Sequence, residues 1–128
     1  MKNPASAYQN TSFEAAPPLK ILRMLYAGAL KFIDQASVME LPGDNIEFNE
    51  RLQRAEAIVS ELRCSLESSH SPELAQQLDS LYVYAAGQIC EAMLERKTAP
   101  LGNARKILSS LKEAWDQLEV EGGGAQVA

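Results

Sequence analysis

The chain has 128 residues, a mass of 14.0 kDa and 46% apolar residues, which suits one domain with a hydrophobic core and excludes a wholly disordered protein. Seventeen acidic residues against twelve Lys and Arg give a net charge of −5, which argues against a partner held through phosphate groups, so we expect no nucleic-acid binding. No apolar stretch reaches the roughly 20 residues that a membrane span needs, and the N-terminus does not read as a secretory signal. We therefore expect a soluble, cytoplasmic protein with no membrane insertion.

The first 16 residues form a polar segment that holds Asn, Ser, Thr, Gln and Ala, with Tyr8 and Phe13 as its only aromatic side chains. Two rings are too few to hold such a segment in place by themselves. We therefore predict a flexible N-terminal arm over residues 1–16, which acts as a removable lid and can lay its rings on an apolar surface elsewhere.

Residues 17–66 contain two segments with the apolar spacing of amphipathic helices. Two prolines at 17–18 precede the first, whose apolar residues recur every three or four positions until a Pro-Gly pair at 42–43 interrupts the pattern. Asp44 comes just before the second segment, and Glu47 three residues later has the position expected in a capping box. The sequence therefore predicts two helices, the second capped by Asp44.

Residues 71–120 predict two further helices. Ser71 and Pro72 are residue types preferred at an N-cap and at the first helical position, and a polar run over 95–98 ends the third helix. Pro100 opens the fourth helix, in which Trp115 is the expected core anchor, and three glycines at 122–124 end the ordered part. The core stripe expected on the third helix consists of Leu74, Leu78, Leu81, Ala85, Ile89 and Ala92.

No segment alternates with a period of two, so no sheet is expected. Four helices of about 20 residues joined by short connections pack with neighbours antiparallel. We predict an all-α fold: an antiparallel up-down four-helix bundle over residues 17–120, with the flexible N-terminal arm at 1–16 and a flexible tail at 121–128.

Two of the predicted helices carry more apolar surface than one core-facing stripe needs. On the first helix the additional residues, here called the methionine row, are Ile21, Met24, Gly28, Phe32 and Met39. On the third helix the additional residues, here called the small-residue row, are Val83, Ala86, Gly87, Cys90 and Leu94. Either the third helix lies centrally and buries both of its faces, or the rows form grooves that accept an amphipathic partner helix.

The sequence offers little for catalysis. There is one histidine, His70, and the chain contains no Gly-rich phosphate loop, no His/Cys ligand cluster and no nucleophile elbow. Two cysteines, Cys64 and Cys90, are expected to be reduced thiols, with Cys64 on the side of its helix away from the apolar stripe. We therefore expect no enzyme activity, no cofactor and no metal ion.

Four segments occur in the order found in one known family. They are YQNT at 8–11, LRMLYAGAL at 22–30, LDSLYVY at 78–84 and LSSLKEAW at 108–115. Together they make the chain, over roughly residues 8 to 116, similar to the flagellar secretion chaperone family FliS. Two departures are the two prolines before the first helix, where relatives commonly have Ser-Pro, and Met93-Leu94-Glu95-Arg96 in place of a polar, Asn-containing end of the third helix.

The resemblance implies a cytoplasmic export chaperone that binds the disordered C-terminal segment of flagellin. Such a chaperone prevents premature polymerisation and assists delivery to the flagellar type III export apparatus, with an export-gate component as a further partner. By position, Tyr8 belongs to the arm that can cover part of the client site in the family, and Tyr26, Gly28 and Tyr82 belong to recurrent helix motifs.

The alternative interpretation is a structural adaptor that uses the same apolar faces to form a homodimer or to hold a folded partner. The oligomeric state expected under the chaperone interpretation is a monomer or a weak homodimer. Under either interpretation, the predicted partner-binding residues are Tyr8, Ile21, Met24, Tyr26, Gly28, Phe32, Tyr82, Val83, Ala86, Gly87, Cys90 and Leu94.

Overall fold

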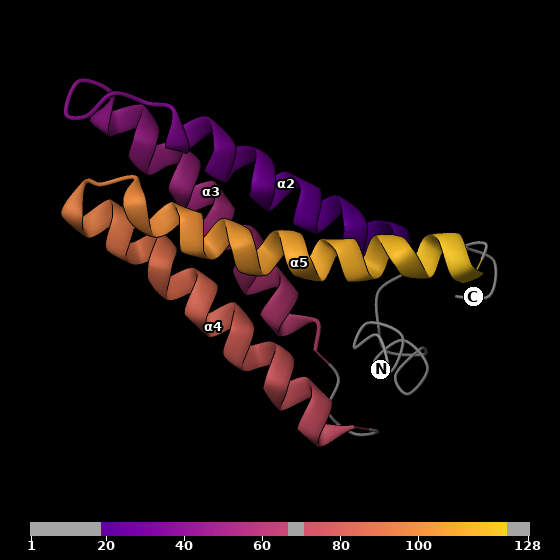
Figure 1. The fold of residues 1–128 in the computed structure, drawn as a ribbon. Helices are drawn as coiled ribbons and strands as arrows, with labels where there is room; N and C mark the ends of the chain where they lie inside the picture. The colour runs from indigo at the N-terminus through magenta and orange to yellow at the C-terminus, as the bar shows by residue number, and fades with distance from the viewer. Residues whose placement is uncertain (1–18, 67–70, 123–128) are drawn as a thin grey trace.

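A computed structural model of the chain describes residues 19–66 and 71–122, and within these ranges it contains α-helices and no strand. The helices are α2 (Leu19–Ser37), α3 (Asn45–Cys64), α4 (Pro72–Glu95) and α5 (Ala99–Gly122). Figure 1 shows successive helices running in opposite directions, so the predicted antiparallel bundle is confirmed. Tyr8, Phe13 and His70 lie outside the described residues.

Each helix packs mainly against two others. α2 contacts α3 and α5, and α4 contacts the same two helices, so α2 and α4 lie diagonally across the bundle. Figure 1 shows this arrangement, with α5 in front, α3 behind, and α2 and α4 on opposite sides. As a result, α3 has one flank beside α2 and the other beside α4.

The 38–44 connection differs in part from the prediction. α2 ends at Ser37, before the Pro-Gly pair, so Met39 lies in the connection and not on the helix as expected. α3 begins directly after Asp44, as expected, but the Asp44 side chain makes no capping hydrogen bond to that helix. Its carboxylate instead accepts the backbone N–H of Glu40 at 2.8 Å, because the connection folds back on itself and the Asp44 N–H also donates to the Glu40 carbonyl at 2.9 Å. The predicted capping box is therefore wrong, although the helix boundary is right.

α4 begins and ends where the sequence predicts. Pro72 occupies the first turn, where the missing N–H of proline leaves no helical hydrogen bond unmade. At the other end Arg96 takes a left-handed backbone conformation with φ of 55°, and backbone N–H groups after the helix donate to the carbonyl of Ala92. This satisfies one of the carbonyls that the end of a helix leaves without an intrahelical donor.

Three aromatic side chains form the centre of the core. Trp115, Tyr26 and Tyr82 are at most 2% exposed, and the Tyr26 ring centroid lies 6.5 Å from that of Trp115 and 6.3 Å from that of Tyr82. The two tyrosine hydroxyls share a hydrogen bond, which satisfies polar groups that would otherwise be costly to bury. Trp115 is confirmed as a core anchor.

This burial corrects one part of the partner-binding prediction. Tyr26 and Tyr82 were expected at the partner surface, but both face inward and offer no side-chain area to a docking molecule. The reason is that Tyr82, rather than Leu81, occupies the centre of the core-facing side of α4. Their hydroxyl pair joins two diagonal helices, so their role in this structure is structural.

Candidate partner-binding surface

The methionine row, apart from Met39, which is partly buried in the connection after α2, lies on the flank of α2 that adjoins α3. A Cβ atom at Gly28 would stand 3.2 Å from Cδ1 of Ile58 on α3, and the guanidinium carbon of Arg54 on α3 lies 5.8 Å from the Phe32 ring centroid. Ile21 is 44% exposed and Met24 is 60% exposed. The row is therefore open at the beginning of α2 and partly covered by α3 side chains in the middle of the helix.

The small-residue row is open to solvent over most of its length. Val83 is 47% exposed and Leu94 is 85% exposed, and Gly87 and Cys90 are exposed as well. A Cβ atom added at Gly87 would meet no atom within 4 Å. The alternative in which α4 lies centrally and buries both faces is therefore wrong.

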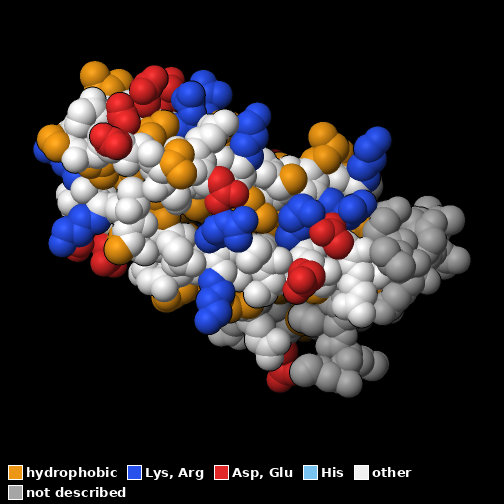
Figure 2. All heavy atoms as spheres, turned by 45° about the horizontal axis from the view of Figure 1, so that its top comes forward, with side chains coloured by type: hydrophobic (Ala, Val, Ile, Leu, Met, Phe, Trp, Pro, Cys, Tyr) orange, Lys and Arg blue, Asp and Glu red, His pale blue; other side chains and the backbone are white. Residues whose placement is uncertain are grey.

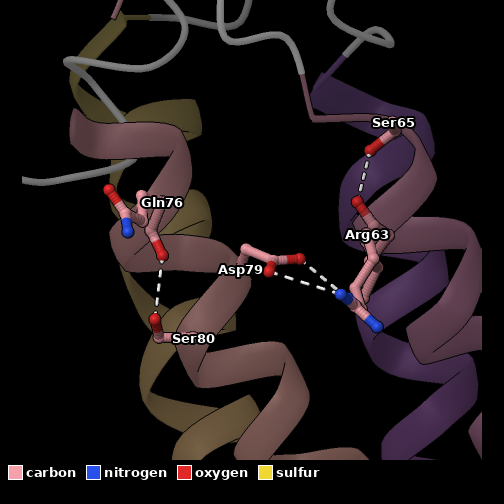
Figure 3. Close-up of polar contacts among 6 residues, drawn as sticks. Arg63, Ser65, Gln76, Asp79 and Ser80 are labelled. Carbon is pink, nitrogen blue, oxygen red and sulfur yellow. Dashed lines mark hydrogen bonds and ion pairs between the residues drawn. The ribbon is translucent and has the colours of Figure 1, made fainter. Parts of the chain in front are cut away.

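An ion pair identifies the flank of α4 to which this row belongs. Arg63 on α3 donates to the Asp79 carboxylate on α4 at 2.7 Å, as Figure 3 shows. Val83 and Cys90 follow Asp79 by four and eleven residues, so helical periodicity places them on the same flank. The opposite flank of α4 faces α5, where Gln88 accepts a hydrogen bond from Asn103 at 2.8 Å.

Both rows therefore adjoin α3, one on each of its flanks. Near the start of α4 a shallow cleft between α3 and α4 continues the small-residue row towards the connection between these helices. This cleft is lined by Arg63, Leu66, Pro72, Ala75, Gln76 and Asp79. A long partner that occupies both rows has to cross or wrap around α3.

The flanks that face α5 are closed by polar contacts instead. Arg23 on α2 donates to Asp116 on α5 at 2.6 Å, and Arg105 on α5 donates to Asp34 on α2 at 2.7 Å. Burial by itself would raise the pKa of Asp116, but hydrogen bonds from Lys112 and Arg23 outweigh it and hold that pKa below its ordinary value. The α5 side of the bundle is thus fixed by charge pairs and carries neither apolar row.

On the face that carries α2, the exposed apolar side chains do not merge into one large surface. Figure 2 turns the side of α2 towards the viewer and shows hydrophobic side chains set among Lys, Arg, Asp and Glu. Apolar contacts rimmed by charged groups are typical of protein interaction sites. The arrangement suits a helical partner whose apolar stripe lies between polar edges.

Three exposed apolar residues were missed by the sequence reasoning. Val38 is 81% exposed, Ile46 is 86% exposed and Tyr84 is 46% exposed. Val38 and Ile46 stand on either side of the Pro-Gly turn and fall outside the core stripes, which is the signal that could have identified them. Tyr84 lies towards the α5 flank of α4, apart from the small-residue row.

The described residues include two cysteines and several exposed carboxylates. Among them there is no group of three or more His, Cys, Asp or Glu side chains that could hold a metal ion. Cys64 and Cys90 are both free and both exposed. Over the same part of the chain, no helix is long and apolar enough to cross a membrane.

An all-α bundle with two exposed apolar rows is, as a class, a helical bundle suited to holding another protein. The comparison with protein families agrees with this class, because the family model described as flagellar protein FliS matches residues 1–122. The chain belongs to the FliS family, which confirms the resemblance found in the four sequence segments.

Several characterised relatives bear the same name. The chain is similar to the flagellar secretion chaperone FliS of Vibrio cholerae, with 32% identity over 125 residues that cover 94% of this chain and 92% of that protein. It is 31% identical to the flagellar secretion chaperone FliS of Bacillus subtilis over 118 residues, covering 91% and 86% of the two chains. For the flagellar secretion chaperone FliS of Salmonella typhimurium, identity is 28% over 117 residues, covering 88% and 87%. These relatives are named as secretion chaperones of the flagellum.

Proposed function

We propose that this protein is a cytoplasmic export chaperone that binds the disordered C-terminal segment of flagellin in a one-to-one complex. In this role it keeps flagellin from polymerising before export and assists its delivery to the flagellar type III export apparatus, where an export-gate component is the further partner. The observation that carries the proposal is the pair of exposed apolar rows beside α3, on a chain whose relatives are named flagellar secretion chaperones.

The geometry of the rows favours a client that is unfolded when free. The methionine row and the small-residue row lie on different faces of the bundle, so a compact partner would reach only one of them. An extended segment can lay one helix on each row and fold as it binds. Binding then hides the apolar stripe of the client that would otherwise drive assembly.

The N-terminal arm at 1–16 has a place in this proposal as a lid, with Tyr8 contacting an apolar row when no client is bound. Helices α2 to α5 all lie within residues 19–122, so removal of the arm should leave the bundle intact. Circular dichroism of the chain lacking residues 1–16 should show the helical signal of α2 to α5 unchanged. Loss of a large share of that signal would contradict the role of a lid.

Titration calorimetry with the purified flagellin C-terminal segment tests the main proposal. We expect a stoichiometry of one and a negative heat-capacity change, because the contact buries apolar surface. Met24→Glu, which places a charge on a side chain that is 60% exposed, should weaken binding while the bundle stays folded. Absence of heat and of co-elution at roughly 50 µM, a concentration that far exceeds the Kd of ordinary specific complexes, would refute the proposal.

The same samples discriminate against a homodimeric adaptor. Light scattering should give the mass of one chain without client and of one chain plus one segment with client. A stable mass of two chains that does not change when the flagellin segment is added would favour the adaptor. Leu94, which is 85% exposed, would then be the first residue to test as a dimer contact.

A further inference from the structure

The helix that carries the small-residue row is acidic throughout. Between Pro72 and Glu95 it contains Glu73, Asp79, Glu91 and Glu95 and not a single Lys or Arg. Asp79 is paired with Arg63, whereas the three glutamates are exposed and have no ion pair with any residue that the structure describes. The exposed surface of α4 therefore carries uncompensated negative charge.

One of the α4 carboxylates, Glu91, borders the small-residue row. Glu91 follows Gly87 by four residues and therefore lies beside the row, whereas Glu95 follows Gln88 by seven residues and lies towards the α5 flank. On the facing helix, Glu56 precedes Arg63 by seven residues and thus lies on the flank of α3 that adjoins α4. The row consequently has carboxylates on both sides and, near Asp79, one arginine whose charge is already neutralised.

The methionine row has the opposite surroundings on its own helix. Lys20 precedes Met24 by four residues and Lys31 follows it by seven, and both lysines are exposed. The remaining charged residues of α2, Arg23 and Asp34, are paired with α5. The next helix, α3, contributes both signs, so the uncompensated charge on α2 itself is positive.

We propose that the small-residue row takes an amphipathic helix of the partner whose apolar stripe is flanked by Lys or Arg. The inference rests on the proposed function, since it assigns this basic segment to the client. Small side chains at Ala86 and Gly87 let the two helix axes approach closely, and the glutamates then meet the basic flanks of the bound helix. Lys20 and Lys31 repel the same segment from the methionine row, so charge decides which part of the client lies on which helix.

Two synthetic helical peptides test the inference without any flagellin. They share one stripe of Leu and Ala and differ only in flanking Lys or flanking Glu. We expect the Lys-flanked peptide to bind the full chain roughly tenfold more tightly at low salt, because about three exposed charge pairs contribute. The preference should shrink as salt is added, since screening weakens exposed pairs.

Two matched triple variants locate the effect. The first replaces the α4 glutamates and is Glu73→Gln, Glu91→Gln and Glu95→Gln. The control changes three exposed glutamates elsewhere and is Glu47→Gln, Glu61→Gln and Glu113→Gln, which alters the net charge by the same amount. The peptide preference should fall to about twofold or less in the first variant, because exposed pairs are local in effect, and should largely persist in the control.

Equal loss in both variants, or no preference in the unmodified chain, would overturn the inference, because the effect would then come from net charge alone or be absent. The proposed function fails separately, through the flagellin titration. If the chain does not bind the flagellin segment but still prefers the basic peptide through α4, the inference stands and the proposed client is wrong. If the chain binds the flagellin segment but shows no such preference, the proposed client stands and the inference is wrong.

Discussion

Replacement of Gly87 by leucine is the substitution that best separates folding from binding in this protein. Gly87 lies in the interior of α4, and a Cβ atom there would point into open space. A leucine side chain would therefore start in open space and not against packed atoms of the core. The change fills the surface proposed for the client and leaves the core unaltered.

The two effects should have opposite signs. Glycine in a helix interior is less favourable than leucine by about 0.8 kcal/mol, so the variant should unfold at a temperature higher by about 2–5 °C for a domain of this size. A client helix that approaches the row would meet the added side chain, and overpacking of this kind costs about 1–3 kcal/mol. Client affinity should then fall roughly 5- to 150-fold.

Gly102→Leu is the matched control. Gly102 is an exposed helical glycine on α5, and a Cβ atom there would also meet no atom within 4 Å. It lies outside both apolar rows, so its substitution should leave client affinity unchanged. Thermal melting and calorimetry on both variants supply the comparison.

A melting temperature lowered by several degrees in Gly87→Leu would contradict the reasoning, since it would mean that the side chain meets packed atoms. Unchanged client affinity in a folded Gly87→Leu protein would remove the small-residue row from the client site. Binding would then be assigned to the methionine row, at Ile21, Met24 and Phe32.

Two further predictions concern the ion pairs and the thiols. Asp116→Asn removes the carboxylate that accepts a hydrogen bond from Arg23, and it should cost about 1 kcal/mol or less at neutral pH because both side chains are about one-third exposed. Since the folded-state pKa of Asp116 is lowered, this stabilisation is present above the unfolded-state pKa and is lost as pH falls through the folded-state pKa. Denaturation at a series of decreasing pH values should therefore show the unfolding free energies of the variant and the original chain converging. A difference that stays constant with pH would contradict the prediction. Bound client should slow the reaction of Cys90 with a thiol reagent in Cys64→Ser, whereas an unchanged reaction rate of Cys90 would place the client elsewhere.

The sequence determined where the helices lie in the chain and that each of them is amphipathic. Apolar spacing is a local property of each segment, and prolines at helix starts act on their own turn, so α2 to α5 occur where they were predicted, except that α2 ends at Ser37, before the Pro-Gly pair. The Asp44 side chain shows the limit of such local rules. Its carboxylate had two possible donors, the first turn of α3 and the N–H of Glu40, and the path of the connection favoured the second.

The sequence also identified the two rows as apolar surface beyond the needs of a core, but not their exposure. Periodicity gives the angle of a residue about its own helix axis and says nothing of the neighbour on that side. Phe32 is half-buried because Arg54 of α3 lies over it, whereas Leu94 is open because no other helix reaches it. On α4, Tyr82 is buried inside the bundle, whereas the next residue, Val83, is exposed.

Tertiary structure alone decided that both rows adjoin α3. The arrangement depends on which pairs of helices pack together. Ion pairs between different helices show this pairing, with Arg63 and Asp79 joining α3 to α4 and Arg23 and Asp116 joining α2 to α5. A helical pattern is set within a few turns, but the partner of each flank is set by the free energy of packing all the helices at once.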